Sequence, residues 1–141
     1  MPNTVFTNAR ILDGTGDSSF SGEVRIDGNR IQQISIDGSS LSHDDADVID
    51  CAGATLMPGL VEAHAHASFG NTSTLEALGE VPIEEHTLMT MKHVKLLLDQ
   101  GFTSINSAAA AKARLDVVIR NAINAGDIPG PRMLAASPEL T

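Results

Sequence analysis

The stretch PGLVEAHAH, residues 58–66, joins a Pro-Gly turn to a mostly apolar strand that carries His64 and His66 near its end. Because the side chains of a strand alternate between its two faces, Glu62, His64 and His66 are predicted on one face and the alanines on the other. Imidazoles one strand repeat apart can converge on one metal ion, and histidine nitrogen is a preferred ligand of zinc and similar divalent metals. The stretch therefore predicts a metal site at the end of a buried strand.

A structural explanation of the same pair competes with the metal site. Two histidines in a core strand could simply be satisfied by backbone carbonyls. Buried imidazoles are unfavourable unless they are paired, and His64 and His66 on one face of one strand double that requirement. The spacing therefore favours the metal site, with Glu62 as a neighbour that would either support the site or pair with another group.

Beyond residue 58 the sequence alternates between strand-like and helix-like patterns. Acidic residues favour the start of the first helix and Gly101 its end, while Ser107 is expected to cap the second helix. Within that second helix, Asp116 and Arg120 are expected to pair across one turn. Such a series belongs to a doubly wound sheet or to a closed barrel, which needs about 250 residues. The predicted strands span residues 60–66, 102–106 and 132–136, and the predicted helices span residues 83–99 and 109–125.

The first third of the chain has the character of β structure. Asp27-Gly28-Asn29 is a hairpin turn signal between two alternating segments. A polar stretch, residues 37–47, separates this hairpin from later short strands. We expect these pieces to form part of a small sheet or sandwich in a first domain, residues 1–57, ahead of a second domain, residues 58–141. Strands are expected over residues 5–12, 23–26, 30–36, 48–49 and 55–57.

The charge balance limits the classes of partner. The 141 residues include 18 acidic and 9 basic side chains, which give a formal net charge of −9. Nucleic acid and anionic membrane surfaces both require a basic face, so neither is an expected partner. The start of the sequence lacks the basic and apolar segments of a secretory signal, and no apolar run reaches membrane-spanning length. We therefore expect a cytoplasmic protein.

The other three histidines are not expected to bind metal. His86 and His93 lie two helical turns apart, about 10 Å along the axis, and are predicted on the helix surface. His43 lies in an acidic loop and is expected to be solvated. The carboxylates of that loop lack the glycine and the later glutamate of a helix–loop–helix calcium site. Cys51, the only cysteine, is expected to be structural.

Residues 48–66, VIDCAGATLMPGLVEAHAH, closely resemble the entry segment of the amidohydrolase superfamily. In that superfamily a short strand, a D-x-x-G turn and a Pro-Gly-led H-x-H strand connect a β-sandwich to the first strand of a barrel. The segments NARILDGTG, GFTSI and IPGPRMLAAS are also similar to the superfamily, nearest to the imidazolonepropionase and Xaa-Pro dipeptidase-like branch. The resemblance implies an α/β chain that holds part of a β-sandwich, completed by a later segment, and the first three strands of a TIM-like (β/α)8 barrel.

The resemblance also implies a function. His64 and His66 would bind one or two divalent metal ions, with zinc as the expected metal. A metal-activated water would then hydrolyse a C–N bond of a small-molecule amide, urea, carbamate or cyclic amide. In the superfamily the other ligands, a lysine and two histidines, and a catalytic aspartate come from later strands, so the general base is expected beyond Thr141. The superfamily usually has aspartate where this sequence has Glu62.

Two hypotheses describe the whole protein. In the first, the sequence is the N-terminal fragment of a longer metal-dependent hydrolase, inactive by itself and a candidate homo-oligomer at full length. In the second, it is a truncated, non-catalytic chain that binds metal weakly or only contacts a partner. The substrate itself is not predicted, because substrate choice depends on loops that are mostly outside this sequence.

Overall fold

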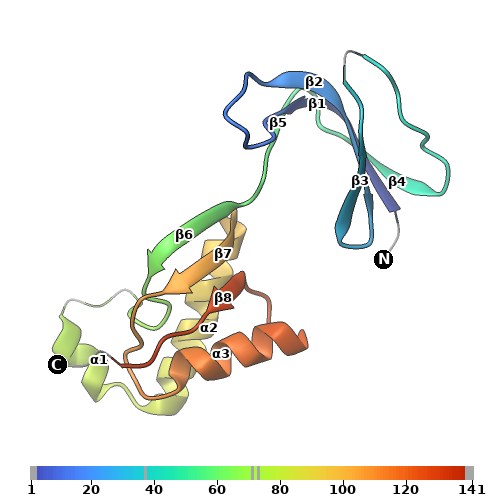
Figure 1. Cartoon of the computed structure of the whole chain (residues 1–141). Coiled ribbons are helices and arrows are strands. Elements are labelled where there is room, and N and C mark those ends of the chain that lie inside the picture. Colours follow the sequence, from blue (N-terminus) through green and yellow to red (C-terminus); the bar gives the residue numbers. More distant parts are fainter. Residues whose placement is uncertain (1–2, 37, 71, 73, 139–141) are drawn as a thin grey trace. The chain divides into compact units, whose positions relative to one another are not determined.

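The chain divides into two compact units, and each is described by itself. The computed structural model describes residues 3–36, 38–70, 72 and 74–138. The first unit is Met1–Pro58 and the second is Gly59–Thr141. The first contains only strands among its described residues, whereas the second mixes helices with parallel strands (Figure 1). The chain is therefore an α/β protein, as predicted.

The first unit is a five-stranded sheet. Its strands are β1 (Asn3–Ile11), β2 (Phe20–Asp27), β3 (Arg30–Ile34), β4 (Ala46–Asp50) and β5 (Thr55–Leu56). The order is β3-β2-β1-β4, and β5 also pairs with β1. The β2–β3 hairpin confirms the predicted turn, where Gly28 adopts a positive φ of 58° that suits glycine. Ala9, Ile11 and Val24 form the buried centre of this unit.

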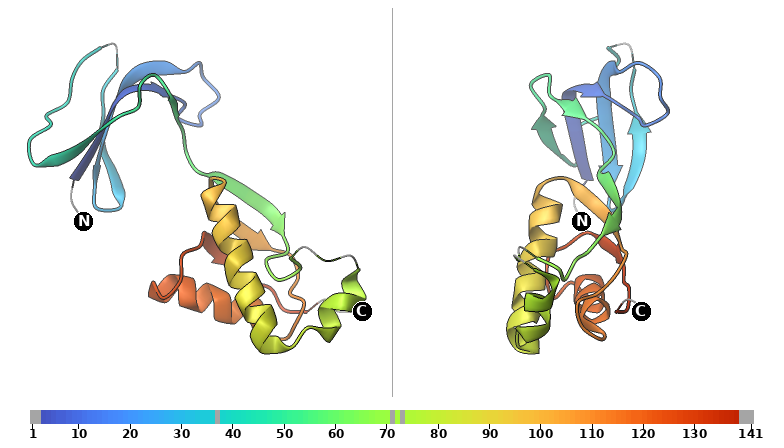
Figure 2. Two further views of the ribbon diagram at one scale, coloured as in Figure 1. Left: turned by 180° about the vertical axis from the view of Figure 1, so that it is seen from behind. Right: turned by 90° about the vertical axis from the view of Figure 1, so that its left-hand side faces the viewer.

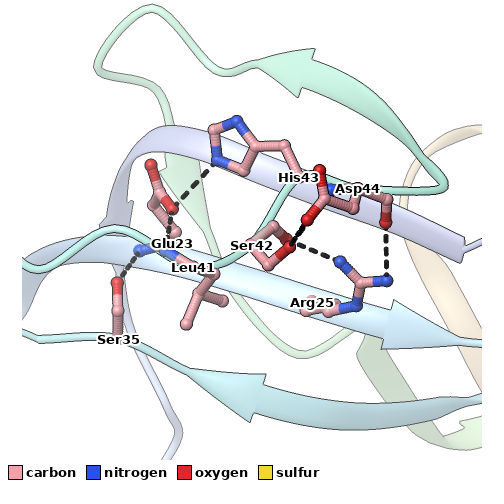
Figure 3. Close-up of polar contacts among 7 residues, drawn as sticks. All are labelled: Glu23, Arg25, Ser35, Leu41, Ser42, His43 and Asp44. Atoms are coloured by element: carbon pink, nitrogen blue, oxygen red, sulfur yellow. Dashed lines mark hydrogen bonds and ion pairs between the residues drawn. The ribbon is translucent and has the colours of Figure 1, made fainter.

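The loop between β3 and β4 is fastened to β2 by side-chain hydrogen bonds (Figure 3). One carboxylate oxygen of Glu23 accepts from the Leu41 backbone N–H at 2.8 Å and lies 3.3 Å from the His43 ring. The Arg25 guanidinium donates to the carbonyls of Ser42 and Asp44. His43 is therefore partly held, although its side chain keeps 41% of its surface exposed. Asp37, the first residue of the predicted polar stretch, lies outside the described residues.

The second unit contains a three-stranded parallel sheet in the order β6-β7-β8. Helices α2 and α3 cover one face of this sheet (Figure 2), where Val94, Ile105, Ile119 and Met133 are buried together. The predicted alternation of strands and helices is confirmed, and α1 is an additional short helix, capped by Thr74. The elements are β6 (Leu60–Ala65), α1 (Leu75–Glu80), α2 (Ile83–Asp99), β7 (Phe102–Ser107), α3 (Leu115–Ala125) and β8 (Arg132–Leu134).

The predicted start of the second long helix is wrong. Helix α3 begins at Leu115 rather than Ala109, after Arg114 in a left-handed conformation with φ of 62°. The preceding backbone N–H groups bond elsewhere: Ala108 donates to Ala65 O at 2.7 Å, and Ala111 donates to Ser68 Oγ at 2.9 Å. These bonds hold the alanine run against other segments, and the left-handed backbone of Arg114 interrupts a right-handed helix, so the run is a loop despite its helix propensity.

Two expected roles on this segment change with the later helix start. Ser107 is the last residue of β7, so it does not cap α3. The expected Asp116–Arg120 pair is also wrong, because Asp116 is buried and accepts a hydrogen bond from the Ser107 hydroxyl. Arg120 instead donates to the side chain of Asn121.

Strand β6 is largely exposed, so the prediction of a buried strand is wrong for this chain. Val61 exposes 68% of its surface, whereas Ala65 is buried. The physical reason is the position of β6: it lies at one edge of the three-stranded sheet, whose second face carries no helix among the described residues. Only the end of the strand reaches the core formed with α2 and α3.

Gly59 offers a test of how closely β6 and β7 must approach. A Cβ added at this position would lie 2.1–2.7 Å from side-chain atoms of Thr103. We predict that Gly59→Ala lowers the free energy of unfolding by about 1–3 kcal/mol, because overpacking forces Thr103 to move. Gly79→Ala is the matched control, since an added Cβ meets nothing within 4 Å in helix α1. Denaturant midpoints that fall equally for both variants would contradict this packing constraint.

Candidate metal centre

His64 and His66 lie together at the carboxyl end of β6. Their ring centroids are 5.1 Å apart and the ring planes meet at 73°. Ala65, between them, is buried in the core with α2 and α3, so the two imidazoles flank a residue that anchors the strand end. His64 is exposed and His66 is partly buried. The structure thus brings the two predicted ligand side chains next to each other.

The predicted alternation of side chains is interrupted before the histidines. Glu62 pairs with Ile105 and Ala65 pairs with Ser107, and the register shifts by one residue between these two pairs. Since Ile105 and Ser107 share one face of β7, Glu62 belongs to the same face as Ala65. The prediction that Glu62 shares a face with the histidines is therefore wrong, and a β-bulge is the reason.

Hydrogen bonds fix the main chain within this bulge. The Glu62 carboxylate accepts from the His64 backbone N–H at 3.0 Å. From the neighbouring strand, the Asn106 side-chain amide donates to Ala63 O at 3.2 Å. Glu62 therefore contacts the peptide of His64 rather than its imidazole. Both bonds limit where the His64 side chain leaves the strand.

The His66 ring is held on one side by an aromatic neighbour. It stacks on Phe69 with centroids 4.2 Å apart and an interplanar angle of 23°. Its Nδ1 atom is buried and has no hydrogen-bond partner among the described residues. A buried ring nitrogen without a partner is unfavourable unless it meets another polar group or a cation.

Two histidines of α2 bind the backbone that follows His66. His86 on α2 is 1% exposed, and its Nε2 donates to the carbonyl of Ser68 at 2.6 Å. His93 is part-buried, and its Nδ1 donates to the carbonyl of Ala67 at 2.9 Å. The prediction that His86 and His93 lie on the helix surface is wrong, because α2 packs against the loop that follows β6. Their spacing was a usable signal: His86, Thr90, His93 and Val94 form one helical stripe.

Asp116 completes this buried layer. Its side chain is fully buried, and Oδ2 accepts from the Ser107 hydroxyl, while Oδ1 has no partner among the described residues. Burial raises the pKa of the Asp116 carboxyl, while the hydroxyls of Ser107 and Ser68 and the imidazoles of His66 and His86 act in the opposite direction. Sequence reasoning placed Asp116 in a surface pair and so missed it.

The donor set at the end of β6 suits a divalent metal. Two imidazoles 5.1 Å apart, one with an unpartnered buried nitrogen, match the chemistry that zinc and similar ions prefer. In residues 3–36, 38–70, 72 and 74–138, no group of three or more His, Cys, Asp or Glu side chains is placed to hold a metal ion. His64 and His66 would therefore supply only part of a complete ligand set.

Sequence comparison identifies the family. Residues 55–141, more than half of the chain, match the sequence profile of the Amidohydrolase family. The chain belongs to this family. The matched segment contains both histidines and the Pro-Gly turn before them. The predicted resemblance is thereby confirmed at the level of the family.

Solved structures support the same assignment. A Xaa-Pro dipeptidase with bound methionine in its active site superposes with a TM-score of 0.83 and 29% identity, over 98% of this chain and 34% of that chain. An amidohydrolase superposes with a TM-score of 0.82 and 25% identity, over 99% of this chain and 32% of that chain. The chain therefore shares the fold of these proteins and spans about a third of their length.

A curated sequence relative covers a shorter region. The dihydroorotase of Syntrophotalea carbinolica (strain DSM 2380 / NBRC 103641 / GraBd1) is 37% identical over 62 residues, which is 44% of this chain and 14% of that protein. The chain thus spans a small part of this relative. Among the described residues, no helix combines the length and apolar character that crossing a membrane requires.

The buried histidine of α2 gives a stability prediction. His86→Ala should lower the free energy of unfolding by about 1–3 kcal/mol, because the buried Ser68 carbonyl loses its hydrogen-bond donor. His43→Ala is the control, since that side chain is 41% exposed and should change stability by about 0.5 kcal/mol or less. Thermal and denaturant melts measure both values. Equal midpoints for the two variants would remove the structural importance assigned to His86.

Proposed function

We propose that this chain is part of a metal-dependent hydrolase that cleaves a C–N bond of a small molecule, with His64 and His66 among the metal ligands. The observation that carries the proposal is the 5.1 Å separation of the two imidazole rings at the end of β6. Membership of the amidohydrolase family supports hydrolysis. The proposed bond is that of an amide, cyclic amide, urea or carbamate, and relatives named dihydroorotase and Xaa-Pro dipeptidase favour the amide and the cyclic amide.

The residues at the end of β6 have separable roles in this proposal. His64 and His66 would hold the ion, which when bound supplies Lewis-acid activation of water and of a carbonyl group. Glu62 and Asn106 fix the main chain on either side of His64. Phe69 covers one face of the His66 ring and limits its rotation. These contacts hold the His66 ring and the main chain around His64 without an ion.

The remaining parts of the enzyme are also proposals. The ligand set would be completed by residues outside these 141, on later strands of a TIM-like (β/α)8 barrel that continues the order β6-β7-β8. A later segment would complete the sandwich of the first unit. We further propose zinc as the metal, one or two ions per site, a cytoplasmic location and a homo-oligomeric full-length form. Catalysis would need a general base from the same later strands.

Metal content and turnover test the ligand assignment together. The full-length protein is expected to carry close to stoichiometric metal and to hydrolyse a member of a panel of Xaa-Pro dipeptides, aryl ureas, carbamates and cyclic amides. His64→Ala and His66→Ala should each lose both the metal and the activity, because each removes a ligand. Elemental analysis and hydrolysis assays provide the two readouts, and His43→Ala, far along the sequence in the first unit, is the control.

The outcomes separate the two hypotheses about the protein. Retained metal and full turnover in either histidine variant would contradict the ligand assignment. A parent protein that binds metal weakly and hydrolyses no member of the panel would instead favour the truncated, non-catalytic chain.

A further inference from the structure

The turn that follows β6 places the Phe69 ring against the His66 ring. It spans residues 66–69 and is closed by a hydrogen bond from the Phe69 backbone N–H to His66 O at 3.1 Å. Because this bond brings the first and last residues of the turn together, their side chains can stack, with ring centroids 4.2 Å apart. The orientation of the His66 imidazole is therefore linked to the backbone conformation of the turn.

The last peptide group of this turn is fixed at both of its polar atoms. Its N–H is the Phe69 group that donates to His66 O. Its carbonyl belongs to Ser68 and accepts a hydrogen bond from Nε2 of His86 at 2.6 Å. Since a peptide group is planar, the two bonds together fix its orientation. Helix α2 thus supplies one of the two bonds that hold the peptide from which the Phe69 side chain leaves the backbone.

The surroundings of His86 are unfavourable for a side chain that only fills space. His86 is 1% exposed, and its Nε2 carries the hydrogen of the bond to Ser68, because a carbonyl oxygen can only accept. The other ring nitrogen, Nδ1, is buried and has no hydrogen-bond partner within the described part of the chain. An apolar side chain of similar size would fill the same space without an unsatisfied nitrogen. The hydrogen bond to Ser68 O is therefore what distinguishes His86 from a packing residue.

We propose that His86 is a positioning residue for the metal centre: it orients the His66 imidazole through the turn and the stacked Phe69 ring. This inference rests on the proposed function, because it requires His66 to be a metal ligand. Every link in the route is a direct contact, first from His86 to Ser68 O, then across one peptide group, then between two stacked rings. A ligand ring that is already held in place loses less freedom when the ion binds, so the contacts increase metal affinity.

A purely structural role is the competing explanation. In that case the bond from His86 to Ser68 O would only join α2 to the turn. Its loss would lower stability and leave the metal affinity of the folded protein unchanged. Ile119 provides a reference for such a role, since it is 1% exposed and belongs to the apolar core on α3. The two roles therefore differ in a measurement that does not involve turnover.

The test is zinc affinity, measured by chelator competition on folded variants of the full-length protein. His86→Leu fills the space but removes the donor, and it should bind zinc about tenfold more weakly than the parent, the lower end of the range for residues that support metal-binding histidines. His86→Gln keeps a side-chain N–H near the position of Nε2 and should restore most of the affinity. Ile119→Ala is the control for lost stability, and it should bind zinc as the parent does although it leaves a cavity in the core.

A double-mutant cycle tests the route through Phe69. Phe69→Leu removes the stacked ring and should also weaken zinc binding. If His86 acts through this ring, His86→Leu has little further effect on zinc affinity in the Phe69→Leu background, so the two losses do not add. Full additivity of the two losses would overturn the proposed route.

Three further results decide between the possible failures. Zinc affinity of His86→Leu within about twofold of the parent, or a loss no larger than that of Ile119→Ala, would assign a structural role and overturn the proposal. If His86→Leu does not fold, Phe69→Leu decides: zinc affinity equal to that of the parent overturns the proposal, and weaker binding supports it. If His66→Ala retains metal, the proposed function itself fails. If His66→Ala loses metal while His86→Leu keeps full affinity, only the role of His86 fails.

Discussion

Hydrogen bonds from backbone N–H groups after β7 to the end of β6 and the loop that follows it control the local structure around His66. Ala108 donates to Ala65 O, and Ala111 donates to the Ser68 side chain. These bonds hold the alanine run against the end of β6 and the loop after it, and the left-handed Arg114 keeps the chain irregular until Leu115. The late start of α3 in turn carries Asp116 next to Ser107.

The sequence predicted the elements whose ends are determined by residues at those ends. Helix α2 spans Ile83–Asp99 as expected, because acidic residues occupy its first turn and Gly101 follows its end with φ of 92°. The β2–β3 hairpin follows from Asp27-Gly28-Asn29 for the same reason. The start of α3 was not predictable from propensity, because the contacts that hold the preceding loop come from residues more than 40 positions away.

The candidate site shows the same division between local and distant causes. The pairing of His64 with His66 could be predicted, because a two-residue spacing at a strand end keeps the rings close even beside a bulge. The face of Glu62 could not, because the bulge depends on pairing with β7. Burial of His86 and Asp116 was also missed. Polar residue types are usually exposed. His86 and Asp116 are buried because Ser68 and Ser107 supply hydrogen-bond partners from other segments.

The two imidazoles of α2 also have a mechanical consequence. His86 and His93 donate hydrogen bonds to the carbonyls of Ser68 and Ala67, which belong to the two residues immediately after His66. The helix and this turn must therefore shift as one body, since sliding α2 would break both bonds together. Displacement of the exposed surface of α2, which includes Leu88 and Leu96, would therefore also displace the turn that follows His66.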